Sequence, residues 1–181
     1  AELPNASAVL IADLANIDEV NSFGRFEAII HNAGISYGEL FDVNVLAPYI
    51  LTAEIETPNR LIYLSSSMHK GGSMLKNEAE IPNISYSDSK FLLTLLMDYV
   101  AKIYPKTYVN AVDPGWVPTK MGGQSAPDDL QKGYETKLWL ATSEEDAAKV
   151  TGKYFFHQQQ QSALSVGEVA TGLEGNIYSG S

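Results

Sequence analysis

Apolar residues along the chain are grouped in short runs that stop at turn-forming or polar residues. Runs at residues 28–31, 60–64 and 108–112 end before Asn-Ala-Gly, Ser-Ser-Ser and Asp-Pro-Gly sequences, and shorter runs occupy residues 9–11 and 154–156. Short apolar runs bounded by turn residues are typical of buried strands in a parallel sheet. The pattern therefore predicts a strand at each of these places.

The segments between the strands have the apolar spacing of helices. The clearest is residues 86–103, where apolar side chains recur on one helical face. The polar residues 69–85 have no sustained period and are predicted to form a long loop. We predict further helices at residues 17–22, 41–53, 127–141 and 144–150.

This alternation of strands and helices predicts an α/β fold, a three-layer Rossmann-like doubly wound parallel sheet. Ligands of such folds bind beyond the carboxyl ends of the strands. We assign residues 1–157 to one domain of this type. Residues 158–181 begin with four Gln and continue with small residues, which predicts a low-complexity, loosely ordered tail.

The amino-acid composition limits the kinds of partner and site that this protein is expected to have. The formal net charge is −10, from 22 acidic and 12 basic residues, which argues against nucleic acid and anionic membranes as partners. No apolar run approaches the roughly 20 residues that span a bilayer. The chain has no Cys, which excludes disulfides and thiol chemistry and is compatible with a cytoplasmic protein. His31, His69 and His157 show no paired ligand spacing, so we expect no metal site.

Tyr86 and Lys90 are four residues apart on the clearest predicted helix, which places them on one face. A nearby ammonium group favours the phenolate, so we expect it to lower the pKa of the tyrosine towards a value useful for proton transfer. With ten tyrosines in the chain, such a pair also arises readily by chance.

Other polar residues follow predicted strands. Ser66 lies where its hydroxyl could hold a substrate oxygen beside Tyr86, or could cap the next segment. The turn at residues 31–34 would let a ligand approach the backbone, or is an ordinary tight turn. Asn44, in a predicted helix interior, either faces solvent or makes a specific hydrogen bond.

Taken in order, these motifs resemble those of the short-chain dehydrogenase/reductase family. They correspond to its Asn-Asn-Ala-Gly turn, its tetrad Asn, its catalytic Ser, its Tyr-x-x-x-Lys pair and its Pro-Gly turn. Ser66 is chosen because the second Ser of a strand-end pair is the family's usual catalytic position. The resemblance extends from about Val9 to His157, and its motifs are His31-Asn32-Ala33-Gly34, Asn44, Ser66, Tyr86-Ser87-Asp88-Ser89-Lys90 and Pro114-Gly115-Trp116-Val117-Pro118-Thr119.

The resemblance implies hydride transfer between NADP or NAD and a small carbonyl or alcohol substrate. It implies that Tyr86 is the general acid/base, that Lys90 lowers the pKa of Tyr86 and binds the nicotinamide ribose, and that Ser66 orients the substrate. Asn44 would hold a water in a proton relay. The implied cofactor-binding residues are Asp13, Leu14, Asn32, Ala33, Gly34, Tyr86, Lys90, Pro114, Gly115, Val117 and Thr119.

The family's first strand, its Gly-x-x-x-Gly-x-Gly turn and its second strand have no counterpart in this sequence. The strand predicted at residues 9–11 looks like the family's third. We therefore expect an N-terminal part of the fold that the given sequence does not include. The alternative is a non-catalytic relative that has lost cofactor binding and serves as a binding or regulatory protein.

The residues around the implied site also bear on substrate and assembly. Met68, Trp116, Met121 and Tyr134 suggest an apolar substrate pocket, although such residues are more often core. A serine hydrolase is disfavoured because Ser66 is not in a Gly-x-Ser-x-Gly elbow. The resemblance further implies a homodimer or homotetramer formed through the helices at residues 41–53 and 86–103.

Overall fold

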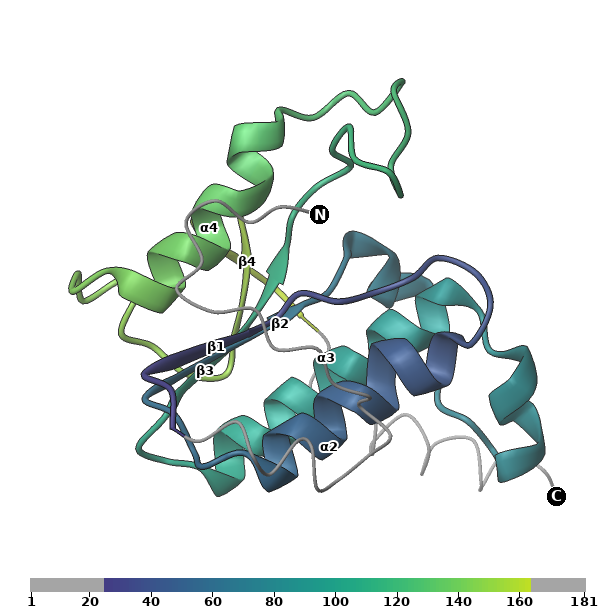
Figure 1. Cartoon of the computed structure of the whole chain (residues 1–181), viewed down its shortest axis with the longest axis horizontal. Helices are drawn as coiled ribbons and strands as arrows, with labels where there is room; N and C mark the ends of the chain where they lie inside the picture. Colours follow the sequence, from purple (N-terminus) through teal and green to yellow (C-terminus); the bar gives the residue numbers. More distant parts are fainter. Residues whose placement is uncertain (1–24, 164–181) are drawn as a thin grey trace, which may run out of the picture.

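The computed structural model describes residues 25–163, which form three layers (Figure 1). A central sheet has helix α4 (Leu130–Thr142) on one face and helices α2 (Ala47–Glu54) and α3 (Tyr86–Ile103) on the other. The predicted strand at residues 9–11 and the predicted helix at residues 17–22 lie outside the described residues.

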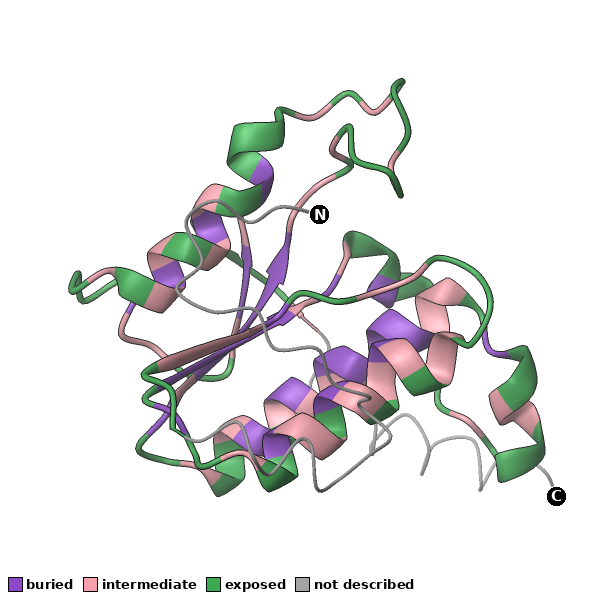
Figure 2. Cartoon of the chain, in the orientation of Figure 1, coloured by how far each residue is buried: buried purple, intermediate pink, exposed green. Residues whose placement is uncertain are grey.

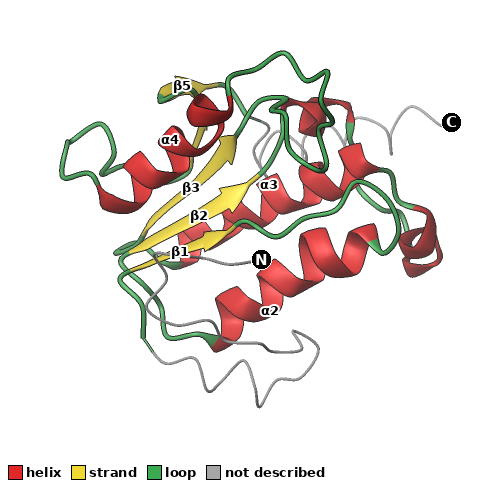
Figure 3. Cartoon of the chain, turned by 45° about the horizontal axis from the view of Figure 1, so that its top comes forward, coloured by secondary structure: helices red, strands yellow, loops and turns green. Residues whose placement is uncertain are grey.

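The sheet has the order β1-β2-β3-β4-β5, in which the first four strands are parallel and β5 is antiparallel to β4. All four predicted strands that fall in the described region are present, and helices cover both faces, so the predicted fold class is confirmed. The parallel strands end at one edge, as Figure 3 shows for β1, β2 and β3. The strands are β1 (Ala28–His31), β2 (Arg60–Leu64), β3 (Tyr108–Asp113), β4 (Lys153–Phe156) and β5 (Gln159–Gln161).

Strand β5 lies where a loosely ordered tail was predicted to begin, so that prediction is wrong for these three residues. The chain reverses between β4 and β5 at His157 and Gln158, whose φ angles are 48° and 60°. Two successive residues with positive φ make a tight hairpin turn, which brings the glutamines against β4. The rest of the predicted tail, residues 164–181, lies outside the described residues.

The core has two parts because side chains of a strand alternate between the faces of the sheet. Leu61 and Tyr63 of β2 pack with α3, where Met97 is also buried. Ile62 points to the other face, towards Leu140 of α4. Buried positions accordingly face the sheet along the helices (Figure 2). On the α4 side, Trp139 meets Phe155 edge to face, with ring centroids 5.7 Å apart.

Helix α3 has the bounds that the sequence predicts because a capping box fixes its start. Ser85 accepts a hydrogen bond from Asp88 N, and the Asp88 carboxylate accepts one from Ser85 N. Helix α4 begins three residues later than predicted, after its N-cap Asp129. The predicted loop at residues 69–85 contains two short 3₁₀-helices, η2 (Ser67–Gly71) and η3 (Glu78–Asn83).

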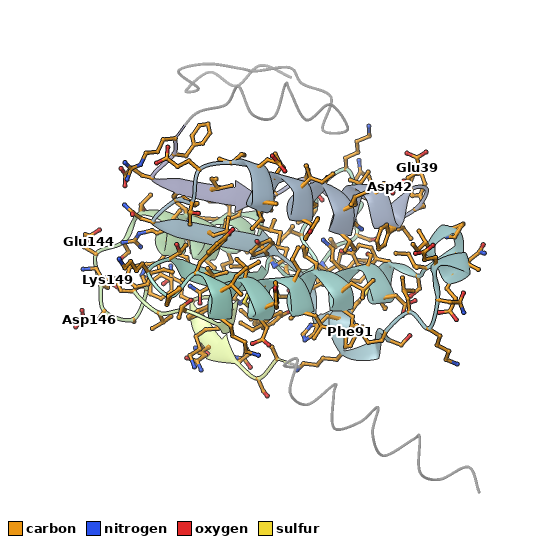
Figure 4. All side chains as sticks on the ribbon, turned by 90° about the horizontal axis from the view of Figure 1, so that it is seen from below. Glu39, Asp42, Phe91, Glu144, Asp146 and Lys149 are labelled. Carbon is orange, nitrogen blue, oxygen red and sulfur yellow. The ribbon has the colours of Figure 1, made fainter. Side chains whose placement is uncertain are left out.

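The helix predicted at residues 144–150 is wrong, because this segment is a turn. Its backbone hydrogen bonds, from Ala148 N to Glu145 O and from Lys149 N to Asp146 O, span three residues and do not continue. Glu144 instead forms ion pairs of 2.9 Å with Lys149 and 3.0 Å with Arg60, and Figure 4 shows it beside Lys149 at one end of the molecule. Among residues 25–163, no helix is both long and apolar enough to cross a bilayer.

Candidate active site

The predicted site residues that the structure describes follow the carboxyl ends of β1, β2 and β3 or begin the helix that packs beside them. Ser66 follows β2, Pro114 follows β3, and Tyr86 is the first residue of α3. Helix α3 is held against η2 at Gly72, where an added Cβ would lie 2.5 Å from Phe91 Cβ. This close packing brings Ser66 and Tyr86, 20 positions apart in the sequence, to the same place.

Ser66, and not Ser65, faces the tyrosine. Ser66 has an extended backbone, and its hydroxyl lies close enough to Tyr86 to lower the pKa of the phenol and accepts a 3.3 Å hydrogen bond from Met68 N. Ser65 is buried, and its hydroxyl lies 2.7 Å from Thr94 Oγ1 inside the interface with α3. The choice of Ser66 over its neighbours therefore agrees with the geometry.

Lys90 lies one helical turn after Tyr86, with its ammonium 5.5 Å from the centre of the tyrosine ring. The side chain is buried, at 5% exposure, and Nζ donates a 2.8 Å hydrogen bond to Leu64 O at the end of β2. Burial disfavours the charged form and lowers the pKa of Lys90 from 10.5 to about 8. Near neutral pH the lysine still holds its proton, so a cation lies beside the phenol.

The expected lowering of the pKa of Tyr86 is not observed. Burial raises the pKa of this half-buried phenol, the nearby hydroxyl of Ser66 opposes that effect, and the negative charge of Asp113 adds to it. Lys90 is not among the groups that shift the pKa. The hydroxyl of Tyr86 is therefore protonated near neutral pH, which is the form that donates a proton.

Asn44 lies in the π-helical turn η1 (Asp42–Leu46), which precedes α2, and its side chain is 1% exposed. Its amide accepts a 2.9 Å hydrogen bond from Ile35 N and donates bonds of 2.9 Å to Ile35 O and 3.0 Å to Ser89 Oγ. Both amide hydrogens are thus used within the protein. The specific hydrogen bond that the sequence left open is present, and it ties η1 both to the loop after β1 and to α3. Turns of π-helix are frequent at functional sites.

Gly34 lies between the groups of this centre. A Cβ at this position would lie 3.3 Å from Asn44 Oδ1 and 3.5 Å from Lys90 Nζ. Asn32 is exposed, and its side-chain oxygen accepts a 2.5 Å hydrogen bond from Lys137 Nζ of α4. Burial lowers the pKa of Lys137 as well. His31, at the end of β1, is buried, stacks on Tyr63 at 4.8 Å and is 3.2 Å from Thr52 Oγ1, so its role is structural.

The Pro-Gly turn follows β3 and begins a loop whose first residues contact Asp128 at the end of the loop. Gly115 has φ +79°, and a Cβ there would meet Asp128 Oδ2 at 2.6 Å. Asp128 Oδ2 accepts a 2.6 Å hydrogen bond from Trp116 N. Val117 packs its side chain near Gly133 of α4. Thr119 is exposed, and its hydroxyl accepts a 3.2 Å hydrogen bond from Gly122 N within the loop.

The four residues suggested as walls of an apolar pocket are not core residues. Met68, Trp116, Met121 and Tyr134 are 53%, 57%, 49% and 46% exposed, respectively. Trp116 is oriented by a 2.8 Å hydrogen bond from Nε1 to Gly122 O. These side chains are therefore available to a ligand. Asp13 and Leu14 lie outside the described residues.

Sequence reasoning missed two buried polar residues at this edge. His69 is fully buried, and its Nδ1 lies 2.7 Å from Ser66 O. Asp113 is 6% exposed, and its carboxylate accepts hydrogen bonds from Ser67 N and Gly115 N. An aspartate at the end of a buried apolar strand is the available signal, because a charge is buried only with partners.

Comparison with curated proteins identifies the family. The short-chain dehydrogenase chyC of Penicillium rubens is 39% identical over 183 residues, which cover 87% of this chain and 70% of that protein. This chain belongs to the short-chain dehydrogenase/reductase family. The short-chain dehydrogenase chry4 of Gibberella zeae is 38% identical over 85% of this chain and 69% of that protein. No family model matches.

Solved structures of lower identity agree with this fold. An NADPH-bound carbonyl reductase from chicken fatty liver has a TM-score of 0.63 at 17% identity, covering 84% of this chain and 75% of that one. The carbonyl reductase Sniffer of D. melanogaster has a TM-score of 0.64 at 18% identity, covering 86% and 77%. The Rossmann-like architecture of this short-chain dehydrogenase/reductase is thus confirmed.

The described residues fit the nicotinamide and ribose part of an NAD(P) cofactor. Gly34 leaves the space between Asn44 and Lys90 free of a side chain, and the ammonium of Lys90 is buried beside it. Gly115 has a left-handed conformation, which glycine adopts readily, in the turn after β3. These features support cofactor binding by the chain's own residues.

Proposed function

We propose that this protein is an NAD(P)-dependent oxidoreductase that reduces a small carbonyl compound, or oxidises the corresponding alcohol, with Tyr86 as general acid/base. The observation that supports it is the convergence of Ser66, Tyr86 and Lys90 from two separate segments at one edge of the sheet. The names of the relatives chyC and chry4, both short-chain dehydrogenases, point to the same chemistry.

In this proposal the protein holds the reacting oxygen and moves its proton. The Ser66 hydroxyl donates a hydrogen bond to the carbonyl oxygen, and the Tyr86 phenol donates the proton that completes the alcohol. Lys90, with its ammonium 5.5 Å from the centre of the ring, binds the nicotinamide ribose beside the phenol. The bound nicotinamide ring supplies the hydride.

The raised pKa of Tyr86 favours the reducing direction. A phenol that keeps its proton near neutral pH is ready to act as an acid, whereas the reverse reaction needs the phenolate. Asn44 is proposed to hold η1 and α3 in place, and to support the relay of protons that the resemblance implies. Lys90, Asn32, Ala33 and Gly34 are proposed to bind the cofactor on one side, and Pro114, Gly115, Val117 and Thr119 on the other.

The test is NADPH-dependent and NADH-dependent reduction of a panel of small ketones and aldehydes, followed by loss of nicotinamide absorbance. Tyr86→Phe removes the transferable proton and should lower kcat by about 10²- to 10⁴-fold with little change in NADPH affinity. Tyr99→Phe, at a 54% exposed position on the same helix, is the matched control and should be fully active. Full activity of Tyr86→Phe would refute the assigned role.

Saturable NADPH fluorescence without turnover of any substrate in the panel would instead favour a binding or regulatory relative. That outcome is the second candidate function. The feature that favours it is that the glycine-rich phosphate loop of the family has no counterpart in the given sequence.

The substrate pocket, assembly and location complete the proposal. The exposed apolar side chains of Met68, Trp116 and Met121 suit a substrate with an apolar flank. Exposed Tyr49 of α2 and Ile103 of α3 suit a homodimer or homotetramer through these helices, and a monomer in light scattering would contradict this. The given sequence contains no Cys, which is compatible with a cytoplasmic location. Cell fractionation tests this location.

A further inference from the structure

Asp113 occupies the last position of β3, where the strand meets the candidate active site. It is 6% exposed in a strand whose other residues are mainly apolar. A carboxylate in such a place costs free energy unless strong hydrogen bonds compensate it. Its contacts therefore explain why an aspartate is there.

Each carboxylate oxygen of Asp113 accepts one backbone hydrogen bond, and the two donors belong to different turns. Oδ1 accepts from Gly115 N at 2.9 Å, two residues ahead in the Pro-Gly turn. Oδ2 accepts from Ser67 N at 2.8 Å, directly after Ser66 and 46 residues away in the sequence. The first is a local turn, whereas the second extends the pairing of β2 with β3, which ends at the hydrogen bond from Ser65 N to Val112 O, into the turns beyond the strands.

We propose that Asp113 is a positioning residue that locks the Ser66 turn to the Gly115 turn. This inference rests on the proposed function, in which Ser66 holds the substrate oxygen and the Gly115 turn receives the nicotinamide. A single rigid carboxylate between them sets the distance between the two reacting partners. Misplacement of reacting groups by about 1 Å is known to cost about a hundredfold in rate.

The geometry calls for an aspartate and not its amide. An ionised carboxylate accepts at both oxygens, whereas an Asn side chain accepts at one and presents N–H groups at the other. Asp113→Asn would therefore keep one of the two hydrogen bonds. In place of the other carboxylate oxygen, the NH2 group of Asn would face a backbone N–H, so that two donors meet without an acceptor. The lost bond is charge-assisted, which makes it one of the stronger kind.

The charge of Asp113 also acts on the proton donor. It raises the pKa of Tyr86, which is also near the ammonium of Lys90 on α3, the hydroxyl of Ser66 and the phenol of Tyr154 on β4. The same carboxylate acts on Tyr154 and on His69 of η2. Replacing the carboxylate by a neutral amide should lower the pKa of Tyr86. A residue that only stabilised the fold would not produce this change.

The experiment compares Asp113→Asn with Asp129→Asn as the matched control. Asp129 also accepts two backbone hydrogen bonds, from Gln131 N and Lys132 N, but both come from the helix that it caps and neither joins two turns. In isotope-labelled protein, Asp113→Asn should move the Ser67 or Gly115 amide resonance upfield. It should also shift the titration of the Tyr86 ring to lower pH, with Tyr86→Phe used to assign that resonance. Asp129→Asn should do neither.

Steady-state kinetics supply the second readout. Asp113→Asn should lower kcat by about tenfold to a hundredfold and move the pH profile to lower pH, while Asp129→Asn leaves both unchanged. An Asp113→Asn variant with unshifted Ser67 and Gly115 amides and an unchanged pH profile would overturn the inference.

The two proposals can fail separately. If the wild-type protein turns over no substrate, the proposed function fails, while the amide and tyrosine resonances still test the lock. If Asp113→Asn does not fold, Ser67→Pro serves in its place, because it removes the N–H that Asp113 Oδ2 accepts, at the first position of η2 and after the extended backbone of Ser66. It should lower kcat by about tenfold to a hundredfold while the hydrogen bond from Gly115 N is kept, and an unchanged kcat would refute the lock.

Discussion

Replacing Lys90 by Met tests the most unusual electrostatic feature of the structure, a lysine at 5% exposure in the second turn of α3. Met keeps the length and apolar stem of the side chain but removes the charge and the hydrogen bond to Leu64 O. The change therefore isolates what a buried ammonium does to the stability of the fold.

The magnitude follows from the pKa of Lys90, which burial lowers from 10.5 to about 8. This difference corresponds to a penalty of about 3 kcal/mol for holding the charged form in the native state. At neutral pH both the native and the unfolded chain carry the proton, so nearly the whole penalty is present. Above about pH 8 the native state releases its proton while the unfolded chain keeps it until about pH 10.5, so Lys90 destabilises the fold less as the pH rises.

The assay is urea unfolding of both proteins at a series of pH values. The free energy of unfolding of the wild-type protein, relative to Lys90→Met, should increase by about 1 kcal/mol between about pH 7 and about pH 9. Lys102→Met is the control, because Lys102 lies on the same helix with its side chain 56% exposed. A wild-type to Lys90→Met difference that is constant with pH, or that falls as the pH rises, would refute the argument.

Two further predictions concern the fold that holds the site. Gly115→Ala and Gly123→Ala both place a Cβ at a positive φ, at +79° and +77°, but only the first meets an atom, Asp128 Oδ2 at 2.6 Å. Chemical denaturation should show a loss of about 1–2 kcal/mol for Gly123→Ala and a larger loss for Gly115→Ala, and equal losses would contradict the close contact. Arg60→Leu removes the 2.9 Å hydrogen bond to Leu140 O near the end of α4 and should lower the free energy of unfolding by about 1–3 kcal/mol. Lys149→Met, which removes only an ion pair of the exposed Glu144, should change the melting temperature little, and a similar loss in both variants would show that the buried carbonyl is unimportant.

Local sequence signals were sufficient for most of the fold. The strand at Arg60–Leu64 and the helix at Tyr86–Ile103 have the predicted bounds, because an apolar run bounded by turn residues and a capping residue act within a few positions. The prediction of a helix at residues 144–150 was wrong because Glu144 forms an ion pair with Arg60. This partner is 84 residues away, and no local sequence pattern reveals it. The hairpin at His157 was missed because neither of its turn residues is a glycine.

The same distinction applies to the site. Ser66, Tyr86 and Lys90 were predicted because, taken in order with the other motifs, they resemble those of the family; their spacing alone, a strand end and one helical turn, also arises by chance. Asp113 was missed because its role depends on a hydrogen bond to Ser67, which a sequence pattern does not contain. The pKa of Tyr86 was predicted to fall because the cation was considered without burial, and burial is the larger effect here.

The two tryptophans give the protein a pair of separate optical reporters. Trp116 is 57% exposed on the loop beside the candidate site, whereas Trp139 is partly buried against Phe155 and donates a hydrogen bond to Glu145. A ligand that covers the loop should shift Trp116 emission to shorter wavelength without disturbing Trp139, and unfolding should shift Trp139 emission to longer wavelength. Two variants that each keep one tryptophan would therefore report ligand occupancy and the integrity of the fold separately, without a substrate.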